Sequence, residues 1–166
     1  TFNCLEEYYM VDIKRDEPQA VVTNKAHGKM RDHAAAEVYV RDFAAVISDE
    51  PPSRGGNNTG PSPLEFMLVA LCACINVSTS RMAEKIRFSY EDLEVFAEGD
   101  LDTRGRKGEA DVPVHYHTVR VDIHIKTDEE DKRMDRLADL VARYCPVDSF
   151  YQAAVPNYHV KWHRMA

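Results

Sequence analysis

Four cysteines are the residues of this chain that are best suited to chemistry: Cys4, Cys72, Cys74 and Cys145. Cys72 and Cys74 stand in the most apolar stretch, L-C-A-C-I-N-V-S (residues 71–78), and Cys145 directly precedes a proline. In a reducing compartment such residues are thiols rather than structural disulfides. They can be inert core side chains, metal ligands, or a redox pair that folding brings together.

The spacing of the cysteine pair disfavours a metal site. Cys72 and Cys74 fall on a predicted helix, where a separation of two residues turns their side chains about 200° apart. They can therefore neither chelate one ion nor bond to each other. His115 and His117 share one face of a predicted strand, whereas His124 has the opposite parity. Two histidines on a strand are more often exposed or hydrogen-bonded, so we expect no metal and no cofactor.

The thiols differ in their expected reactivity. Free cysteine usually packs as a small buried hydrophobe, and this is our interpretation of Cys72. Cys145 ends a predicted helix, where the negative end of the macrodipole opposes thiolate formation, so it suits a resolving role better than an attacking one. Cys74 lies in the third helical turn, beyond the reach of the N-terminal dipole, and would need another group to stabilise its thiolate. Asn76 and Ser78, which follow it, are expected to satisfy backbone or interface hydrogen bonds.

Composition is typical of an ordinary globular protein. The 166 residues are 44% hydrophobic and 30% charged, with a net charge of −7. This length suffices for one domain with a real core. The acidic balance, without long Lys/Arg runs, argues against a nucleic-acid partner. No uninterrupted apolar run approaches the ~20 residues that span a bilayer, and the N-terminus lacks a signal-peptide pattern, so we predict a cytoplasmic protein without a membrane partner.

A strongly signalled helix positions Cys72 and Cys74. The preceding loop, residues 49–63, is rich in proline, glycine and asparagine, so no strand or helix is expected to run through it. Ser62 can cap the helix, Pro63 suits its first position, and Glu65 completes a capping box. The helix is apolar all round over its first half and must be buried on all sides. We therefore place it at the centre of the fold or inside a dimer.

The remaining elements are predicted from periodicity and turn residues. We predict that the central helix runs to about residue 85 and that residues 102–111 form a polar turn or loop. An amphipathic helix is expected to begin at a second capping box (Thr127 and Glu130) and to be stopped by Pro146. A short helix is expected over residues 4–18, and strands over 19–30, 35–40, 43–48, 93–101, 113–127 and 157–163. This order indicates an α+β domain.

Two motifs resemble the OsmC/Ohr family. The segment D-E-P-P-S-R-G-G-N-N-T-G-P-S-P-L-E-F-M-L-V-A-L-C-A-C-I-N-V is similar to the one that opens the family's central helix, and A-R-Y-C-P-V-D-S-F is similar to its second signature, a helix that ends in C-P-V. The resemblance runs from about Glu37 to His163. It implies an OsmC-like fold: an intertwined homodimer with two central helices packed against wrapped antiparallel sheets. Residues 1–166 would form a single domain, with residues 1–28 as an N-terminal extension.

The resemblance also implies a chemistry, that of a two-cysteine thiol peroxidase in a stress response. Cys74 would be the peroxidatic thiol, which attacks an organic hydroperoxide and releases an alcohol. The sulfenic acid left behind would condense with Cys145, the resolving thiol, to a disulfide. A dithiol reductant, a small molecule or a protein, would restore both thiols by exchange. An apolar lining at the dimer interface would select organic peroxides over hydrogen peroxide.

The sequence departs from the family at the groups that would activate the reactive thiol. Family peroxidases carry a glutamate where this chain has Leu64. Glu65 matches the next position, where its expected role is the helix cap rather than catalysis. Arg54 is the expected thiolate stabiliser, with Arg31 and Arg41 as alternatives, and each is otherwise a solvated surface charge.

Two other functions stay open, because a resemblance in fold does not establish chemistry. The first is a binding module that holds a small apolar or acyl ligand at the dimer interface, with vestigial or slow-reacting cysteines. The second, and least favoured, is a metal-dependent enzyme that uses the histidines.

Overall fold

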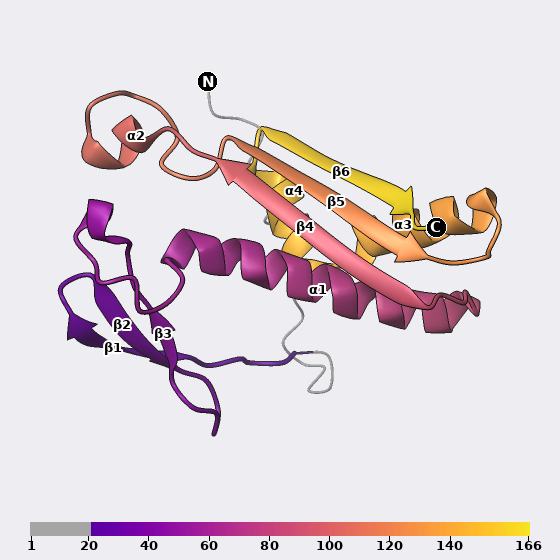
Figure 1. Cartoon of the computed structure of the whole chain (residues 1–166), viewed down its shortest axis with the longest axis horizontal. Coiled ribbons are helices and arrows are strands. Elements are labelled where there is room, and N and C mark those ends of the chain that lie inside the picture. The colour runs from indigo at the N-terminus through magenta and orange to yellow at the C-terminus, as the bar shows by residue number, and fades with distance from the viewer. Residues whose placement is uncertain (1–20) are drawn as a thin grey trace. The chain divides into compact units, whose positions relative to one another are not determined.

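The computed structural model describes residues 21–166, which form two compact units. One unit ends at Gly60 and the other runs from Pro61 to Ala166 (Figure 1). Together they contain helices and sheets in the α+β class that the sequence predicts. The helix predicted over residues 4–18 lies outside the described residues, as does the start of the strand predicted over 19–30.

The first unit is built around a three-stranded antiparallel sheet of order β1-β2-β3. Its strands are β1 (His27–Asp32), β2 (Ala35–Tyr39) and β3 (Val46–Ser48). The predicted hairpin of β2 and β3 is confirmed. Strand β1 begins later than predicted, where its pairing with β2 begins. A single turn of 3-10 helix, η1 (Pro52–Arg54), interrupts the loop in which no helix was expected.

Asp49 organises the loop that follows β3. Its carboxylate accepts hydrogen bonds from the hydroxyl and the amide of Thr59 (2.8 and 2.9 Å), and from the amides of Glu50 (2.8 Å) and Asn57 (3.2 Å). These bonds, above all the one from the Thr59 amide, lower the pKa of Asp49. The loop is so tight that a Cβ at Gly56 would lie 1.8 Å from the Glu50 carbonyl oxygen.

The second unit begins with the long helix α1 (Pro63–Ile86), and its predicted capping box is confirmed. The Ser62 amide donates to the Glu65 carboxylate at 2.7 Å, and the Glu65 amide donates to the Ser62 hydroxyl at 3.4 Å. The helix ends at Arg87, which takes a left-handed conformation with φ 54°. By length and composition α1 could cross a membrane, but the core helix of a soluble protein passes the same test.

Three strands form the sheet of the second unit: β4 (Asp92–Asp100), β5 (Thr118–Lys126) and β6 (Asn157–Arg164). Strand β5 is central, antiparallel to β4 and parallel to β6. The predicted strand over 113–127 is therefore shortened. Its first residues lie beyond the last pair of the β4–β5 ladder, which joins Asp100 to Thr118.

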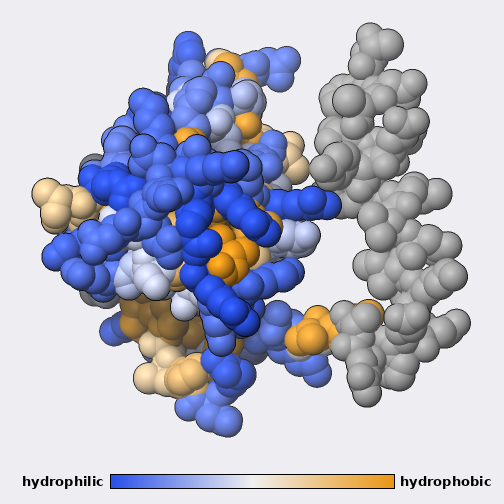
Figure 2. All heavy atoms as spheres, turned by 90° about the vertical axis from the view of Figure 1, so that its right-hand side faces the viewer, coloured by the Kyte–Doolittle hydropathy of each residue, from blue (hydrophilic) through white to orange (hydrophobic). Residues whose placement is uncertain are grey.

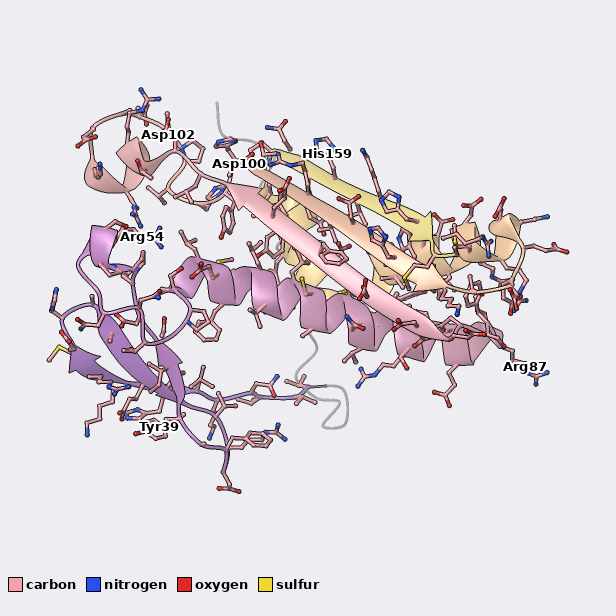
Figure 3. The ribbon with its side chains drawn as sticks, in the orientation of Figure 1. Tyr39, Arg54, Arg87, Asp100, Asp102 and His159 are labelled. Carbon is pink, nitrogen blue, oxygen red and sulfur yellow. The ribbon has the colours of Figure 1, made fainter. Side chains whose placement is uncertain are left out.

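One face of this sheet is buried and the other is polar. Every second residue of β5 is fully buried, at Val119, Val121, Ile123 and Ile125. These side chains pack with α1 and with the two C-terminal helices, which lie behind the sheet in Figure 1. On the opposite face Arg120 pairs with Glu98 and Asp100 (2.8 Å for Asp100), across from His159 on β6 (Figure 3).

Three further helices complete the unit: α2 (Thr103–Lys107), α3 (Asp131–Tyr144) and α4 (Pro146–Ala154). Helix α2 lies in the predicted polar loop, where the Asp102 carboxylate caps it. Pro146 stops α3 as predicted, but it also occupies the first position of α4, a helix that is not among the predicted elements. Proline is well suited to that position, because its missing N–H would be unpaired there anyway.

The second predicted capping box, at Thr127 and Glu130, is wrong. Glu130 itself stands at the N-cap of α3 and makes no side-chain capping bond. The Thr127 hydroxyl instead donates to the Ser89 carbonyl at 2.5 Å and accepts from the Glu129 amide at 3.1 Å. It thereby holds the end of β5 to the segment that enters β4.

Helix α1 is only partly covered by the described residues of one chain. Leu71 and Ile75 face the core and are buried, whereas Met67, Val69 and Val77 are 48%, 51% and 50% exposed. The face of the molecule at the C-terminal end of α1 is mostly hydrophilic, with hydrophobic residues in small groups (Figure 2). The expectation that α1 is buried on all sides therefore does not hold among residues 21–166 of one chain.

Candidate functional site

The thiols of Cys74 and Cys145 meet in the second unit. Cys74 is the twelfth residue of α1, and Cys145 links the end of α3 to the start of α4. The two side chains lie within hydrogen-bonding reach of each other. Helices α1, α3 and α4 pack together and bring the two residues side by side from distant parts of the sequence.

Four influences act on the Cys145 thiol, which is fully buried. Burial is the largest, and it raises the pKa of the thiol because a thiolate loses its hydration there. Hydrogen bonds from the Ser78 hydroxyl and from the Asp148 amide lower this pKa, while the neighbouring Cys74 raises it. The net direction is upward, so Cys145 is a poor attacking group in the reduced protein.

Cys145 lies at the meeting point of two helices with opposite dipole effects. The sequence predicts that this residue lies at a helix C-terminus, which is true of α3. The same residue is also the N-cap of α4, whose N-terminal dipole and amides favour a thiolate. No regular capping hydrogen bond forms there, but the amide of Asp148, the third residue of α4, still acts on the sulfur. Burial, rather than the α3 dipole, is what holds the thiol protonated.

The other described cysteine, Cys72, is half-buried on α1. Burial raises the pKa of its thiol. The helical spacing turns Cys72 about 200° away from Cys74, and its interpretation as an inert packing residue stays a prediction. Asn76 donates to its carbonyl at 3.3 Å, which is one of the backbone hydrogen bonds expected for that residue. Cys4 lies outside the described residues.

An apolar pocket of about 420 Å³ lies between α1, α4 and the segment before β5, and its lining residues include close sequence neighbours of both cysteines. Its α1 wall is made by Met67 and Ala70, which precede Cys74 by two turns and one turn on the same side of the helix. Its α4 wall begins with Val147, two residues after Cys145. The rest of the lining comes from α4 and from the segment before β5: Phe150, Tyr151, Ala154, Val155, His115 and Tyr116.

His115 and His117 have different surroundings. His115 lines the apolar pocket, and its Nδ1 lies 2.8 Å from the Tyr116 carbonyl oxygen. The Nδ1 of His117 instead contacts the Thr118 hydroxyl at 2.8 Å. Among residues 21–166 no three His, Cys, Asp or Glu side chains are grouped in a way that could hold a metal ion.

Leu64 and Glu65 have structural roles at the start of α1. Leu64 is partly buried against the core, and its carbonyl accepts a hydrogen bond from the Tyr116 hydroxyl at 2.9 Å. Glu65 caps the helix together with Ser62, as expected. A catalytic role for Glu65 stays a prediction.

The three candidate arginines lie in the first unit. Arg54, labelled in Figure 3, stands on η1, where its Nε pairs with the Glu50 carboxylate at 2.6 Å. Arg31 belongs to β1. Arg41 has a left-handed φ of 51° and places its guanidinium 4.5 Å from the centre of the Phe43 ring. Which of them, if any, acts on a thiolate stays a prediction.

Two groups at the thiol pair were not identified from the sequence as parts of a site. Ser78 was expected to satisfy backbone or interface hydrogen bonds, but its hydroxyl reaches the Cys145 sulfur. Ser78 follows Cys74 by four residues, so both lie on one side of α1, and this spacing could have indicated from the sequence that Ser78 belongs to the site. The Asp148 amide was missed together with α4, for which the available signal was Pro146 at a helix start.

Comparisons with known proteins identify the family and the fold. The model of a family described as OsmC-like protein matches residues 55–158. An OsmC-like protein from Mycoplasma pneumoniae has a TM-score of 0.75 at 16% identity, and the alignment covers 87% of this chain and 99% of that one. An organic hydroperoxide resistance protein OsmC from Legionella pneumophila has a TM-score of 0.59 at 17% identity, with 89% and 99% covered.

A third solved structure, the organic hydroperoxide resistance protein OhrB of Bacillus subtilis, has a TM-score of 0.59 at 15% identity. The alignment covers 87% of this chain and all 100% of OhrB. At these identities the likeness concerns the fold. A search of curated proteins finds no match.

Proposed function

The chain belongs to the OsmC-like protein family, and from that premise we propose that it is a thiol peroxidase that reduces organic hydroperoxides to alcohols. The observation that carries the proposal is the contact between the Cys74 and Cys145 thiols beside an apolar pocket. Two proteins of similar fold, from Legionella pneumophila and Bacillus subtilis, are organic hydroperoxide resistance proteins, which supports a role in stress-related redox chemistry.

The proposed reaction has two steps. The Cys74 thiolate attacks the distal oxygen of the hydroperoxide, the O–O bond breaks, and the alkoxide takes a proton to leave as an alcohol. The sulfur is oxidised by two electrons to a sulfenic acid. The Cys145 sulfur then attacks the sulfenic sulfur, the S–S bond forms, and the hydroxyl group leaves as water. A dithiol, free or carried by a protein, reduces the disulfide by exchange.

The pocket supports an organic substrate. Its walls are apolar, and its volume of about 420 Å³ lies within the range of small-molecule sites in proteins. A substrate body packed between Met67 and Phe150 would lie beside Ala70 and Val147, which are four residues before Cys74 and two residues after Cys145 in the chain. Hydrogen peroxide has no apolar body and would gain nothing from these walls.

The activating group for Cys74 is part of the proposal. We assign thiolate stabilisation to Arg54, which already holds one carboxylate partner, Glu50, in the first unit. Arg31 and Arg41 are the alternatives. With Leu64 in place of the family glutamate, the orientation that this glutamate would give to the arginine and the substrate is missing. We therefore expect turnover to be slow relative to that of a peroxidase that has both groups.

We further propose that the chain works as an intertwined homodimer in the cytoplasm, with residues 1–166 as one domain. The half-exposed Met67, Val69 and Val77 on α1 give the helix an apolar surface that a second copy would bury. Light scattering at micromolar concentration should give twice the mass of one chain. A monomer at that concentration contradicts this part of the proposal.

A second candidate function is a binding module. The apolar pocket favours it, because such a site can hold a small apolar or acyl ligand without any chemistry. In that case the thiols would be slow to react, and the purified protein would carry a ligand that native mass spectrometry detects. The same measurement on a delipidated sample shows whether the ligand can be added back.

The deciding experiment adds one equivalent of cumene hydroperoxide to the fully reduced protein, followed by intact and peptide mass spectrometry. The proposal expects a loss of two hydrogens that maps to a Cys74–Cys145 disulfide within seconds to minutes. Cys74→Ser should abolish the product, whereas Cys72→Ser, a matched change two residues away on the same helix, should not. Thiols that stay reduced, or that oxidise at random over hours, would overturn the proposal.

A further inference from the structure

Ser78 is the polar side chain on α1 that reaches the resolving sulfur. It is buried, 6% exposed, and follows Cys74 by four residues, so both lie on one side of the helix. Its hydroxyl lies within hydrogen-bonding reach of the Cys145 sulfur and favours the thiolate form. A hydroxyl that donates to a sulfur both stabilises a negative charge there and fixes the direction of the sulfur's lone pairs.

We propose that Ser78 is a positioning residue for the second step of the reaction: its hydroxyl, together with the Asp148 amide at the start of α4, holds the Cys145 sulfur as the nucleophile that closes the disulfide with Cys74. This inference rests on the proposed peroxidase function. It assigns to this chain's own residues the activation of a buried thiol that would otherwise stay protonated.

The geometry also orders the two steps. In the reduced protein Cys74 acts against ionisation of Cys145, since two neighbouring thiolates repel each other and a Cys74 thiolate can accept the Cys145 proton in a hydrogen bond. Attack on the peroxide turns Cys74 into a neutral sulfenic acid, which removes that opposition. The donors that remain at the Cys145 sulfur, Ser78 and the Asp148 amide, both favour the thiolate.

The second step is balanced as follows. The Cys145 sulfur, held by its two donors, attacks the sulfenic sulfur of Cys74, so that the S–S bond forms and the S–O bond breaks. The proton of the buried Cys145 thiol passes to the departing hydroxyl group, which leaves as water. One sulfur has been oxidised by the peroxide in the first step, so the second step needs no further oxidant.

The neighbouring residue Thr79 provides a matched control. It is also fully buried on α1, and its hydroxyl has no hydrogen-bond partner among the described residues. Thr79→Val removes a buried hydroxyl of the same kind, one residue along, without touching the Cys145 sulfur. Any general effect of altering the middle of α1 should appear in this variant too.

The experiment follows both steps after one equivalent of cumene hydroperoxide, with dimedone present to trap sulfenic acid. In Ser78→Ala the first step should keep the wild-type rate, which is measured as the loss of free Cys74 thiol. Disulfide formation should slow by about tenfold or more, as expected for the loss of a hydrogen bond to a charged group, and the dimedone adduct on Cys74 should accumulate. Thr79→Val should behave as the wild type, and Ser78→Thr should restore disulfide formation.

The outcomes separate this inference from the proposed function. If Cys74 never forms a sulfenic acid in the wild type, the peroxidase proposal fails and takes the inference with it. If the sulfenic acid forms and Ser78→Ala closes the disulfide at the wild-type rate, the function stands and the role of Ser78 is wrong. Slowing of both steps in Ser78→Ala and in Thr79→Val would show a general packing effect and would also overturn the role.

Discussion

The phenol of Tyr158, on β6, donates a hydrogen bond to the buried carboxylate of Asp148, in the first turn of α4. A second donor, the Gln152 amide, completes the arrangement. Asp148 has no ion-pair partner among the described residues, so its side chain is held in place by these neutral donors. The contact ties the strand that ends the sheet to the helix that begins at the resolving cysteine.

This contact predicts how stability changes in alkali. Burial, followed by the bond to Asp148, raises the pKa of Tyr158 far above its usual value. The folded state therefore keeps a proton that the unfolded chain loses near pH 10, so stability is fully present below about pH 10 and falls as the pH rises beyond it. Tyr158→Phe should flatten this alkaline slope in urea unfolding followed from pH 7 to 11.

At neutral pH the same variant should cost about 1–3 kcal/mol of unfolding free energy, because Asp148 loses one of its donors while it stays buried. Tyr144→Phe is the matched control, since Tyr144 is 48% exposed on α3. An alkaline slope that is unchanged in Tyr158→Phe would show that other groups cause it.

The cap of α1 gives a prediction that separates structure from catalysis. Ser62→Ala removes the hydroxyl that receives the Glu65 amide and should lower the unfolding free energy by about 1 kcal/mol. Glu65→Ala should lower it by a similar amount, because the Ser62 amide then loses its acceptor. If Glu65 only caps the helix, both variants should keep the wild-type rate of cumene hydroperoxide reduction at 10 °C, where both remain folded. A loss of rate in Glu65→Ala alone would assign Glu65 to catalysis.

The elements that local chemistry determines could be predicted from the sequence. The S-P-L-E start of α1 satisfies its own amides within four residues, so no distant contact is needed to begin the helix there. The β2–β3 hairpin is likewise formed by neighbouring segments. Where an element ends at a distant partner, the prediction fails, as for β5, whose first pair is set by Asp100 of β4.

The missed helix α4 and the wrong capping box at Thr127 have a common physical cause. In each case the residue concerned can serve two structural roles, and the prediction took only one of them. Pro146 ends one helix and begins the next, and only the second role reveals α4. The Thr127 hydroxyl suits an N-cap, but it donates its hydrogen bond to the carbonyl of Ser89, which is remote in sequence. The contact of Cys74 with Cys145 depends on the packing of three helices, so the residues alone could suggest it only through the family resemblance.

The pocket predicts selectivity among peroxides. Phe150 lines it and is 69% exposed, so Phe150→Asp should fold normally while it places a charge in the apolar wall. The rate constant for Cys74 oxidation by cumene hydroperoxide should fall about tenfold to a hundredfold. The rate constant with hydrogen peroxide should change little, because that substrate makes no use of the walls.

Phe96→Asp is the control for this change. Phe96 is 55% exposed on β4, on the sheet face opposite the core, and does not line the pocket. Both rate constants should be unaffected in that variant. Equal losses for the two peroxides in Phe150→Asp would place the defect at the thiol rather than in the pocket.

The loop that carries Arg54 should depend on the charge of Asp49. Hydrogen bonds from the loop amides lower the pKa of this carboxyl, so its contribution to stability is present above the unfolded value near 3.9 and is lost as the pH falls through the lower, folded value. Asp49→Asn keeps the shape but removes the charge that the amides of Asn57 and Thr59 bind. Hydrogen exchange of these two amides at pH 7 should become faster by about tenfold, as expected when a charged acceptor becomes neutral. Asp42→Asn, at an exposed aspartate of the same unit, should leave both amides protected. If Asp49→Asn leaves their exchange unchanged, the loop is held by its backbone turns and Asp49 is not its organiser.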